Sequence, residues 1–185
     1  AYSGMTGYVL GDGSTTLVLE TESSAKERNV KVYAEVAGYG MAHKAVAFGK
    51  LDGSEDALLD AVRFAAEDAG MKLDEIDAIV GFGNGDADTD SLELDAYRKL
   101  FGEKLASLPV FTVKDTTGEG RAASASLSAA HAALMLSDKY ELAGRAYKLQ
   151  ADKMVQTTVD TKALKNVLVT SYGVGGSYCA VIIKK

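Results

Sequence analysis

The stretch IDAIVGFGNGDADTD, Ile76 to Asp90, passes from an apolar run directly into a loop that holds three glycines and three aspartates. The apolar run predicts a buried strand over residues 76–80. After the loop, apolar residues at helical spacing predict a helix from Asp90 to Phe101. A strand that leads through a glycine-rich loop into a helix is typical of a layered α/β domain. This stretch therefore indicates the fold class and raises the question of what the loop does.

The alternation of strands and helices continues on both sides of this stretch. Apolar runs predict strands at 16–20, 30–36, 108–113, 166–171 and 178–183, and helical spacing predicts helices at 54–69 and 121–136. We expect Ser54 to cap the first helix and Gly70 to end it. The expected fold is a mixed β-sheet flanked by helices.

One predicted helix has an unusual composition. Residues 122–133 read AASASLSAAHAA, so that nearly every position carries a small side chain and no broad polar face is present. Small residues on all sides let neighbouring layers approach closely. We therefore expect this Ala/Ser-rich helix to be buried on every side, at the centre of a layered sandwich.

Composition excludes several classes of function. The chain has 185 residues, 47% of them hydrophobic, and a formal net charge of −6, which argues against general binding to nucleic acid or to an anionic membrane. The single cysteine, Cys179, cannot form an internal disulfide. No apolar span of membrane length and no leader is evident, so we expect a cytoplasmic location.

The glycine loop fits neither of two common binding motifs. A calcium loop that started at Asp86 would place Ser91 and Tyr97 where glycine and glutamate are required. The G-x-G-x-G order lacks the spacing of a dinucleotide fingerprint, and the aspartates that follow would repel a pyrophosphate. On local grounds the loop is a solvated turn in which Thr89 or Asp90 caps the next helix.

Several separated stretches change this interpretation when they are taken in order. They are GYVLGDG at 7–13, LVLE at 17–20, VAGYGM at 36–41, FGN at 82–84, VKDTTGE at 113–119 and SYGVGG at 171–176. In order and spacing the chain resembles the C-terminal half of the β-ketoacyl synthases, members of the thiolase-like superfamily. The resemblance implies a C-terminal ketosynthase-like domain over residues 1–185, one half of a thiolase-like layered sandwich, with the N-terminal half absent from this chain.

The resemblance also implies a site, in which this sequence departs from the family. Ketosynthases use two histidines to stabilise the negative charge that develops during condensation. Their positions hold Phe82 and Glu119 here. A phenyl ring donates no hydrogen bond, and a carboxylate would repel an enolate. The family's lysine and glutamate are retained as Lys114 and Glu93, which the resemblance places side by side. We therefore expect no catalytic condensation at this site.

Further features belong to this expectation. The family's nucleophilic cysteine lies in the half that this chain lacks. At the family's gate to the substrate tunnel, an aromatic residue is replaced by Val174, between Gly173 and Gly175. We expect Cys179 to be a small buried residue. We expect His43 and His131 to be structural, because their spacing offers no second metal ligand, so neither a metal nor a cofactor is predicted.

A ketosynthase-like chain with a disabled site resembles the chain-length factor, the β subunit of the ketosynthase pair in type II polyketide or aryl polyene synthesis. The resemblance implies a heterodimer with an active ketosynthase, an acyl carrier protein as a further partner, and the N-terminal half as a separate chain. Such an assembly is an acyltransferase of the 3-oxoacyl synthase type, in which this chain need not be catalytic. We expect no nucleic-acid or membrane partner.

Two alternatives remain open, and so does the origin of the chain. The chain could be an enzyme of the superfamily with an altered site, a decarboxylase or transacylase that uses Lys114 and Glu119. It could also be a non-catalytic thiolase-like scaffold for another partner. We expect proteolytic cleavage of a precursor near Ala1, since residues 1–6 have the composition of an exposed loop.

Overall fold

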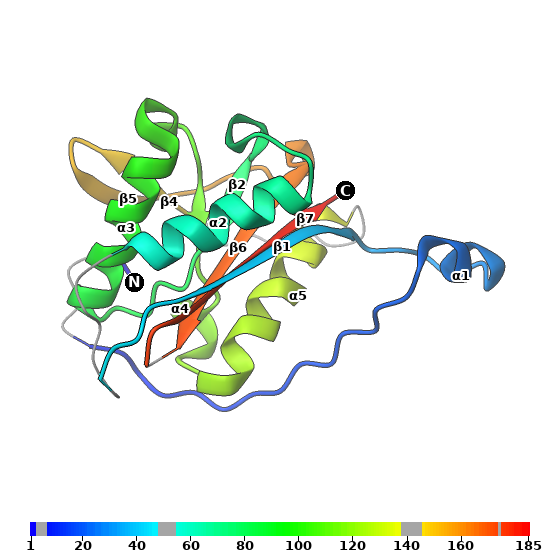
Figure 1. Cartoon of the computed structure of the whole chain (residues 1–185), viewed down its shortest axis with the longest axis horizontal. Coiled ribbons are helices and arrows are strands. Elements are labelled where there is room, and N and C mark those ends of the chain that lie inside the picture. The colour runs from blue at the N-terminus through cyan, green and yellow to red at the C-terminus, as the bar shows by residue number, and fades with distance from the viewer. Residues whose placement is uncertain (3–6, 48–54, 138–145, 174) are drawn as a thin grey trace.

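The fold is a single mixed sheet with helices on both faces (Figure 1). The computed structural model describes residues 1–185 except 3–6, 48–54, 138–145 and 174. Its helices are α1 (Glu22–Glu27), α2 (Asp56–Asp68), α3 (Ala87–Phe101), α4 (Lys114–Thr117) and α5 (Ser124–Leu136). Its strands are β1 (Glu35–His43), β2 (Ala78–Val80), β3 (Val110–Phe111), β4 (Ala146–Gln150), β5 (Lys153–Thr157), β6 (Asn166–Gly173) and β7 (Ser177–Lys184).

The strand order sets the position of the functional loops. Among the described residues the order is β1-β7-β6-β2-β3-β4-β5, with β2 parallel to both β6 and β3 and every other pair antiparallel. The loops that follow the parallel strands β2 and β3 leave the sheet at the same end. In α/β sheets ligands bind beyond this carboxyl end of the strands.

The core forms two layers of side chains, one on each face of the sheet. One layer packs α2 and α3 against Ile79, Leu168 and Ile182, and the other packs α5 against Val80 and Val167. Consecutive strand residues point to opposite faces, so β2 and the apolar run Val167 to Val169 of β6 supply both layers. The expected sheet with flanking helices is confirmed.

Strand β1 could not have been placed correctly from its composition. The expected strand at 30–36 instead begins at Glu35 and continues to His43, through Gly38 and Gly40. A side chain at either glycine would clash with the backbone of α2, which crosses directly over the strand. Glycine at both positions therefore allows α2 to pack closely against β1. At the free edge of β1 the Tyr39 amide donates a 3.0 Å hydrogen bond to Asp68 Oδ2 of α2.

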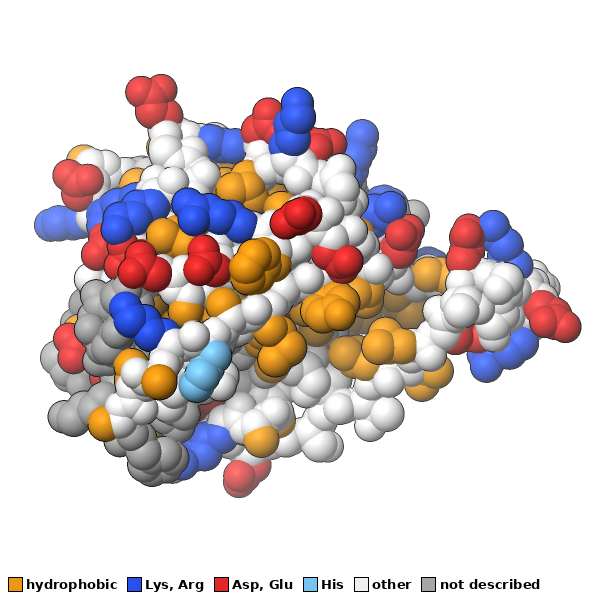
Figure 2. All heavy atoms as spheres, viewed as in Figure 1, with side chains coloured by type: hydrophobic (Ala, Val, Ile, Leu, Met, Phe, Trp, Pro, Cys, Tyr) orange, Lys and Arg blue, Asp and Glu red, His pale blue; other side chains and the backbone are white. Residues whose placement is uncertain are grey.

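Residues 7–34 form an extended arm that runs along the body and carries α1 away from it (Figure 1). The strand expected at 16–20 is wrong, because this segment is extended but pairs with no strand among the described residues. Large apolar side chains along the arm are exposed to solvent, and hydrophobic side chains also gather over β1 (Figure 2). The arm residues are Tyr8, Val9, Leu10, Leu17, Val18, Leu19, Val30, Val32 and Tyr33.

The Ala/Ser-rich segment forms α5, but its burial differs from the expectation. Ser124, Ser128, Ala132 and Met135 are buried, while the other positions between them are half-buried or exposed. The sheet covers one face of α5, and no other described layer covers its second face. Burial on every side is therefore not realised within this chain. None of the helices in the described ranges is long and apolar enough to cross a membrane.

Candidate functional site

The candidate site lies where the loops after β2 and β3 meet. The glycine loop spans residues 81–86, and Asp86 begins α3 by accepting a 3.1 Å hydrogen bond from the Thr89 amide. The N-cap is therefore Asp86, and the expected capping by Thr89 or Asp90 is wrong. The loop is not a solvated turn either, because Gly81, Gly83 and Gly85 are all buried.

Two acidic residues on α3 hold this loop in place. Glu93 is fully buried and accepts hydrogen bonds from the Phe82 and Gly83 amides at 2.7 and 2.9 Å. Its carboxylate also accepts from the hydroxyls of Tyr2, Tyr97 and Thr170 at 2.5, 2.6 and 2.8 Å. Five donors satisfy a buried carboxylate well, so Glu93 acts as the anchor of the loop.

Asp90 has a similar role one helical turn earlier. Its carboxylate accepts from the amides of Tyr2, Asn84 and Gly85 at 2.6, 3.0 and 3.3 Å. Burial raises the pKa of Asp90 above its ordinary value, although these hydrogen bonds act in the opposite direction. The aspartates near this loop would repel a phosphate group, but one of them, Asp90, holds the loop in its conformation through these hydrogen bonds.

Lys114 lies between Phe82 and Glu119. Its Nζ is 2.9 Å from the centre of the Phe82 ring and 2.8 Å from Glu119 Oε2. The ion pair of Lys114 is formed with Glu119, while Glu93 acts on this ammonium only through its charge. Glu93 is instead occupied by the loop amides and hydroxyls.

The Lys114–Glu119 pair is almost completely buried, with side-chain exposures of 3% and 7%. Burial lowers the pKa of Lys114, and the pairing with Glu119 offsets this effect only in part. For Glu119 burial acts to raise the pKa, but the nearby ammonium of Lys114 and the hydrogen bond from Ser124 outweigh it, so this pKa is lowered. The carboxylate is thus held in its ionised form.

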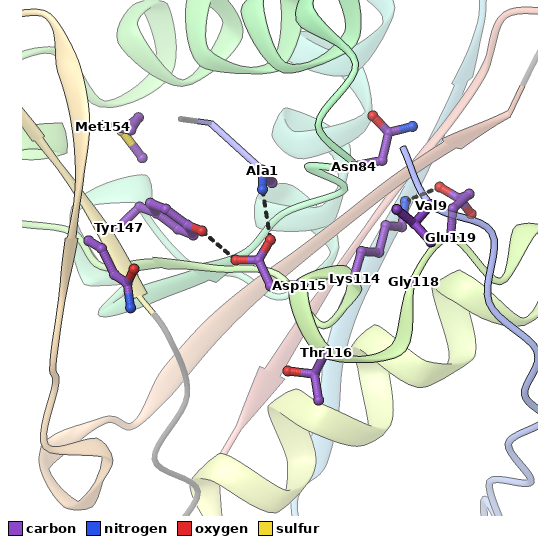
Figure 3. A pocket seen from close by; sticks show the side chains of 11 residues that line it. Ala1, Val9, Asn84, Lys114, Asp115, Thr116, Gly118, Glu119, Tyr147 and Met154 are labelled. Atoms are coloured by element: carbon purple, nitrogen blue, oxygen red, sulfur yellow. Dashed lines mark hydrogen bonds and ion pairs between the residues drawn. The ribbon is translucent and has the colours of Figure 1, made fainter. Parts of the chain in front are cut away.

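A cavity of about 470 Å³ opens beside this pair (Figure 3). It is lined by Ala1, Val9, Asn84, Lys114, Asp115, Thr116, Gly118, Glu119, Tyr147, Met154 and Gln156. The lining comes from the loops after β2 and β3, the start of the arm and the β4–β5 hairpin. Phe82 is not among these lining residues and packs on Tyr172, with ring centres 4.1 Å apart.

The first two residues pack into the site. Ala1 is only 5% exposed, and its amino group lies 2.7 Å from Asp115 Oδ1, while the Tyr147 hydroxyl donates to the other oxygen of Asp115 (Figure 3). The Tyr2 ring lies against Gly81 and Gly83, where a Cβ atom would clash with it. The expectation of an exposed loop is therefore wrong for Ala1 and Tyr2, and residues 3–6 lie outside the described residues.

Other residues singled out in the sequence lie elsewhere. Gly173 and Gly175 border the β6–β7 turn and do not line the cavity, and Val174 lies outside the described residues. His131 packs near Phe111, and burial lowers its pKa. Cys179 is partly buried on β7, and burial raises the pKa of its thiol. No group of three metal-ligating side chains occurs within the described ranges.

The β4–β5 hairpin, which supplies Tyr147, Met154 and Gln156, was missed in the sequence. Its turn places Ala151 and Asp152 at φ values of 42° and 66°. Two residues with positive φ define the tight turns of hairpins, but the usual sequence signal is Asn-Gly or Asp-Gly. Alternation within residues 146–157 was the remaining signal, and it is weak.

Comparison with known proteins identifies the family. Residues 33–143 match the family model described as β-ketoacyl synthase, C-terminal domain. A Streptomyces virginiae protein assigned as polyketide β-ketoacyl synthase 1 is 30% identical over 96% of this chain and 43% of its own length. The 3-oxoacyl-[acyl-carrier-protein] synthase 2 of Coxiella burnetii is 31% identical over 73% of this chain and 33% of its own length.

The solved structures support the fold. The ishigamide ketosynthase/chain length factor superimposes with a TM-score of 0.83 and 24% identity, over 100% of this chain and 46% of the matched chain. At this identity the likeness shows a thiolase-like ketosynthase fold. The chain spans less than half the length of these relatives.

Proposed function

The chain belongs to the β-ketoacyl synthase family by its C-terminal domain, and on that premise we propose that it is a non-condensing ketosynthase-like subunit. It pairs with an active ketosynthase and shapes the tunnel that holds a growing chain on an acyl carrier protein. In this role it is a chain-length factor.

One observation carries the proposal. The two positions that hold histidines in the family are Phe82 and Glu119, and both contact the ammonium of Lys114. Neither can donate a hydrogen bond to a thioester oxygen, so the site lacks the groups that stabilise an enolate. The chain has only two histidines, His43 and His131, and neither lines the cavity.

The exposed arm supports a role within a larger assembly. The family model begins at residue 33, so most of the arm precedes the C-terminal domain. Extended apolar segments such as Val18 and Leu19, which are 80% and 75% exposed, favour burial against another sheet. The remainder of the ketosynthase fold, as a separate chain or as part of a longer one, is the partner that we propose for them.

A second candidate function is favoured by the buried ion pair. Lys114 and Glu119 border a cavity large enough for a small acyl group, and a lysine beside a carboxylate can exchange protons with a ligand. A decarboxylase or transacylase would use these two side chains. Release of CO2 from malonyl-carrier protein by the purified protein would support this candidate.

The test of the proposed function combines purification with product analysis. We expect the tagged protein to purify with a ketosynthase that retains its nucleophilic cysteine. In the reconstituted pair, Met154→Trp should fill the cavity and shorten the products. Val155→Trp is the matched control, because Val155 lies next in β5 but is 41% exposed outside the lining. Absence of a ketosynthase, or unchanged products with Met154→Trp, would contradict the proposal.

A further inference from the structure

An open groove lies along the free edge of the sheet, between β1 and α2. It has a volume of about 400 Å³ and is lined by Tyr39, Gly40, Met41, Phe64, Glu67 and Asp68. The side chains of Tyr39, Met41 and Phe64 are exposed to solvent, and hydrophobic side chains gather over β1 on this face (Figure 2). Aromatic and methionine side chains at a surface are typical of the core of a protein interface.

The groove carries negative charge. Of its six lining residues Glu67 and Asp68 are charged, and both are acidic. Asp68 is used within the chain, because its Oδ2 accepts the hydrogen bond from the Tyr39 amide. The Glu67 carboxylate has no partner among the described residues. An occupant that matches this groove therefore brings apolar side chains together with a positive charge.

The segment that joins α1 to β1 has this complementary composition. Residues 30–33 read Val-Lys-Val-Tyr, and the side chains of Val30, Val32 and Tyr33 are exposed. Lys31 is exposed as well, and its ammonium has no partner in the part of the chain that the structure describes. The segment thus offers an apolar surface next to an unpaired positive charge.

This segment cannot fill the groove of its own chain. It runs from α1 directly into β1, which begins at Glu35, without a turn between them (Figure 1). The groove lies beside residues 39–41, further along the same extended chain. At the rise of an extended strand the stretch from Lys31 to Gly40 spans roughly 30 Å. A segment of this kind reaches the groove only from another molecule.

We infer that two copies of this chain pair about a twofold axis, with residues 30–33 of each copy in the groove of the other. In this arrangement the two β1 strands run antiparallel, and Lys31 of each copy faces Glu67 of the other. The axis passes near Val36, which is exposed and meets its own copy there. Such an interface is self-complementary, because the same two surfaces meet twice.

The groups around the axis are compatible with this pairing. Glu35 is already paired with Lys184 at 3.1 Å, so the two copies do not bring unpaired carboxylates together. Because Asp68 holds the Tyr39 amide, the copies dock through side chains and not through a continuous β ladder. The part of the arm before α1 remains free for the partner that the proposed function assigns to it. The pairing is therefore an additional interface.

The test counts the copies of this chain by native mass spectrometry of the protein purified with the chains that accompany it. We expect two copies in each assembly. Glu67→Lys and Lys31→Glu should each weaken the pairing at least about tenfold, because repulsion replaces attraction at both equivalent contacts. Glu103→Lys, the same change at an exposed residue outside the groove, is the control and should leave the copy number unchanged.

Mixing the two single variants tests whether the contact is made between molecules. Each variant alone places like charges at both contacts. A mixed pair, one copy with Lys31→Glu and one with Glu67→Lys, places opposite charges at both. We therefore expect the two variants, when they carry different tags, to purify together although neither pairs with itself. The combined variant Lys31→Glu/Glu67→Lys should also recover the pairing.

The outcomes separate this inference from the proposed function. One copy per assembly at micromolar concentration, or two copies that neither single variant separates, would overturn the inference. Pairing that is lost in the single variants and not recovered on mixing would also overturn it, and would indicate another cationic partner for the groove. The absence of a ketosynthase from the same spectra would contradict only the proposed function, because the copies of this chain are counted separately.

Discussion

Phe82 lies against the ammonium group of Lys114, with Nζ 2.9 Å from the centre of its ring. A desolvated ammonium over an aromatic ring is stabilised by about 2 kcal/mol. Glu119 contacts the same ammonium at 2.8 Å. Phe82 and Glu119 are thus parts of one arrangement around the Lys114 ammonium.

We expect Glu119→Gln to destabilise the protein by about 3 kcal/mol, because it leaves the buried charge of Lys114 without its partner. Urea unfolding of the purified protein measures the change. Lys114→Met combined with Glu119→Gln should recover most of the loss. Asp95→Asn, which breaks the exposed pair with Arg98, is the control and should have little effect. A small effect of Glu119→Gln would mean that the pair is not buried in solution.

Restoring the histidines should not restore condensation. In the double variant Phe82→His/Glu119→His, both donors return, but the family's nucleophilic cysteine lies outside the half that this chain matches. Radiolabelled malonyl and acyl carrier proteins, supplied to a complex whose partner cysteine is replaced by alanine, measure the activity of this subunit alone. Robust condensation there would show that our view of the site is mistaken.

The Glu93 anchor can be tested through Tyr97, whose hydroxyl lies 2.6 Å from both Glu93 Oε1 and Thr170 Oγ1. Tyr97→Phe removes a buried hydroxyl from this network and should cost about 1 to 3 kcal/mol. Tyr33→Phe, at an exposed tyrosine of the arm, is the matched control. If both variants unfold at the same urea concentration as wild type, Glu93 does not depend on this donor.

His131 should make stability depend on pH near neutrality. Burial lowers its pKa in the folded state below the ordinary value of 6.5. As pH falls through 6.5 the unfolded chain gains a proton that the folded chain does not, so stability declines until the lower folded pKa is reached. Thermal unfolding between pH 7.5 and 5.5 measures this, with His131→Gln expected to flatten the profile. A flat wild-type profile would contradict the effect.

The 185 residues should not behave as a rigid monomer when expressed alone. The apolar arm and the second face of α5 are uncovered in this chain, and soluble monomers seldom tolerate large contiguous apolar surfaces. Size-exclusion chromatography with near-UV circular dichroism is the measurement. A monodisperse, well-packed species of 19.4 kDa would count against this expectation.

Much of the sheet could be predicted, because its central strands carry apolar runs, Ala78 to Val80 in β2 and Val167 to Val169 in β6. The strand expectations at 166–171 and 178–183 match β6 and β7 within two residues at each end. The arm could not be predicted, since a short apolar segment such as 16–20 becomes a strand only where another strand pairs with it. Strand β1 was misplaced for the opposite reason, because its glycines are explained only by the approach of α2.

The resemblance singled out residues of this site but not the contacts between them. Lys114 contacts Glu119 and Phe82, and Glu93 accepts a hydrogen bond from the Phe82 amide. Sequence spacing indicates which residues lie on the same loop or helix. It does not determine which of two carboxylates forms the ion pair with a lysine. That choice follows from the amides of Phe82 and Gly83, which occupy Glu93 and leave Glu119 for the lysine.

The hydrogen bond between the Tyr39 amide and Asp68 bears on behaviour at high protein concentration. Strand β1 ends the sheet, and the exposed amides of an edge strand can recruit a strand from another molecule and start fibril growth. The Tyr39 amide already donates a hydrogen bond to the Asp68 carboxylate. This carboxylate also places a negative charge at the edge of the sheet. Asp68→Ala would leave the edge open, and its aggregates should bind thioflavin T more readily than those of the parent chain.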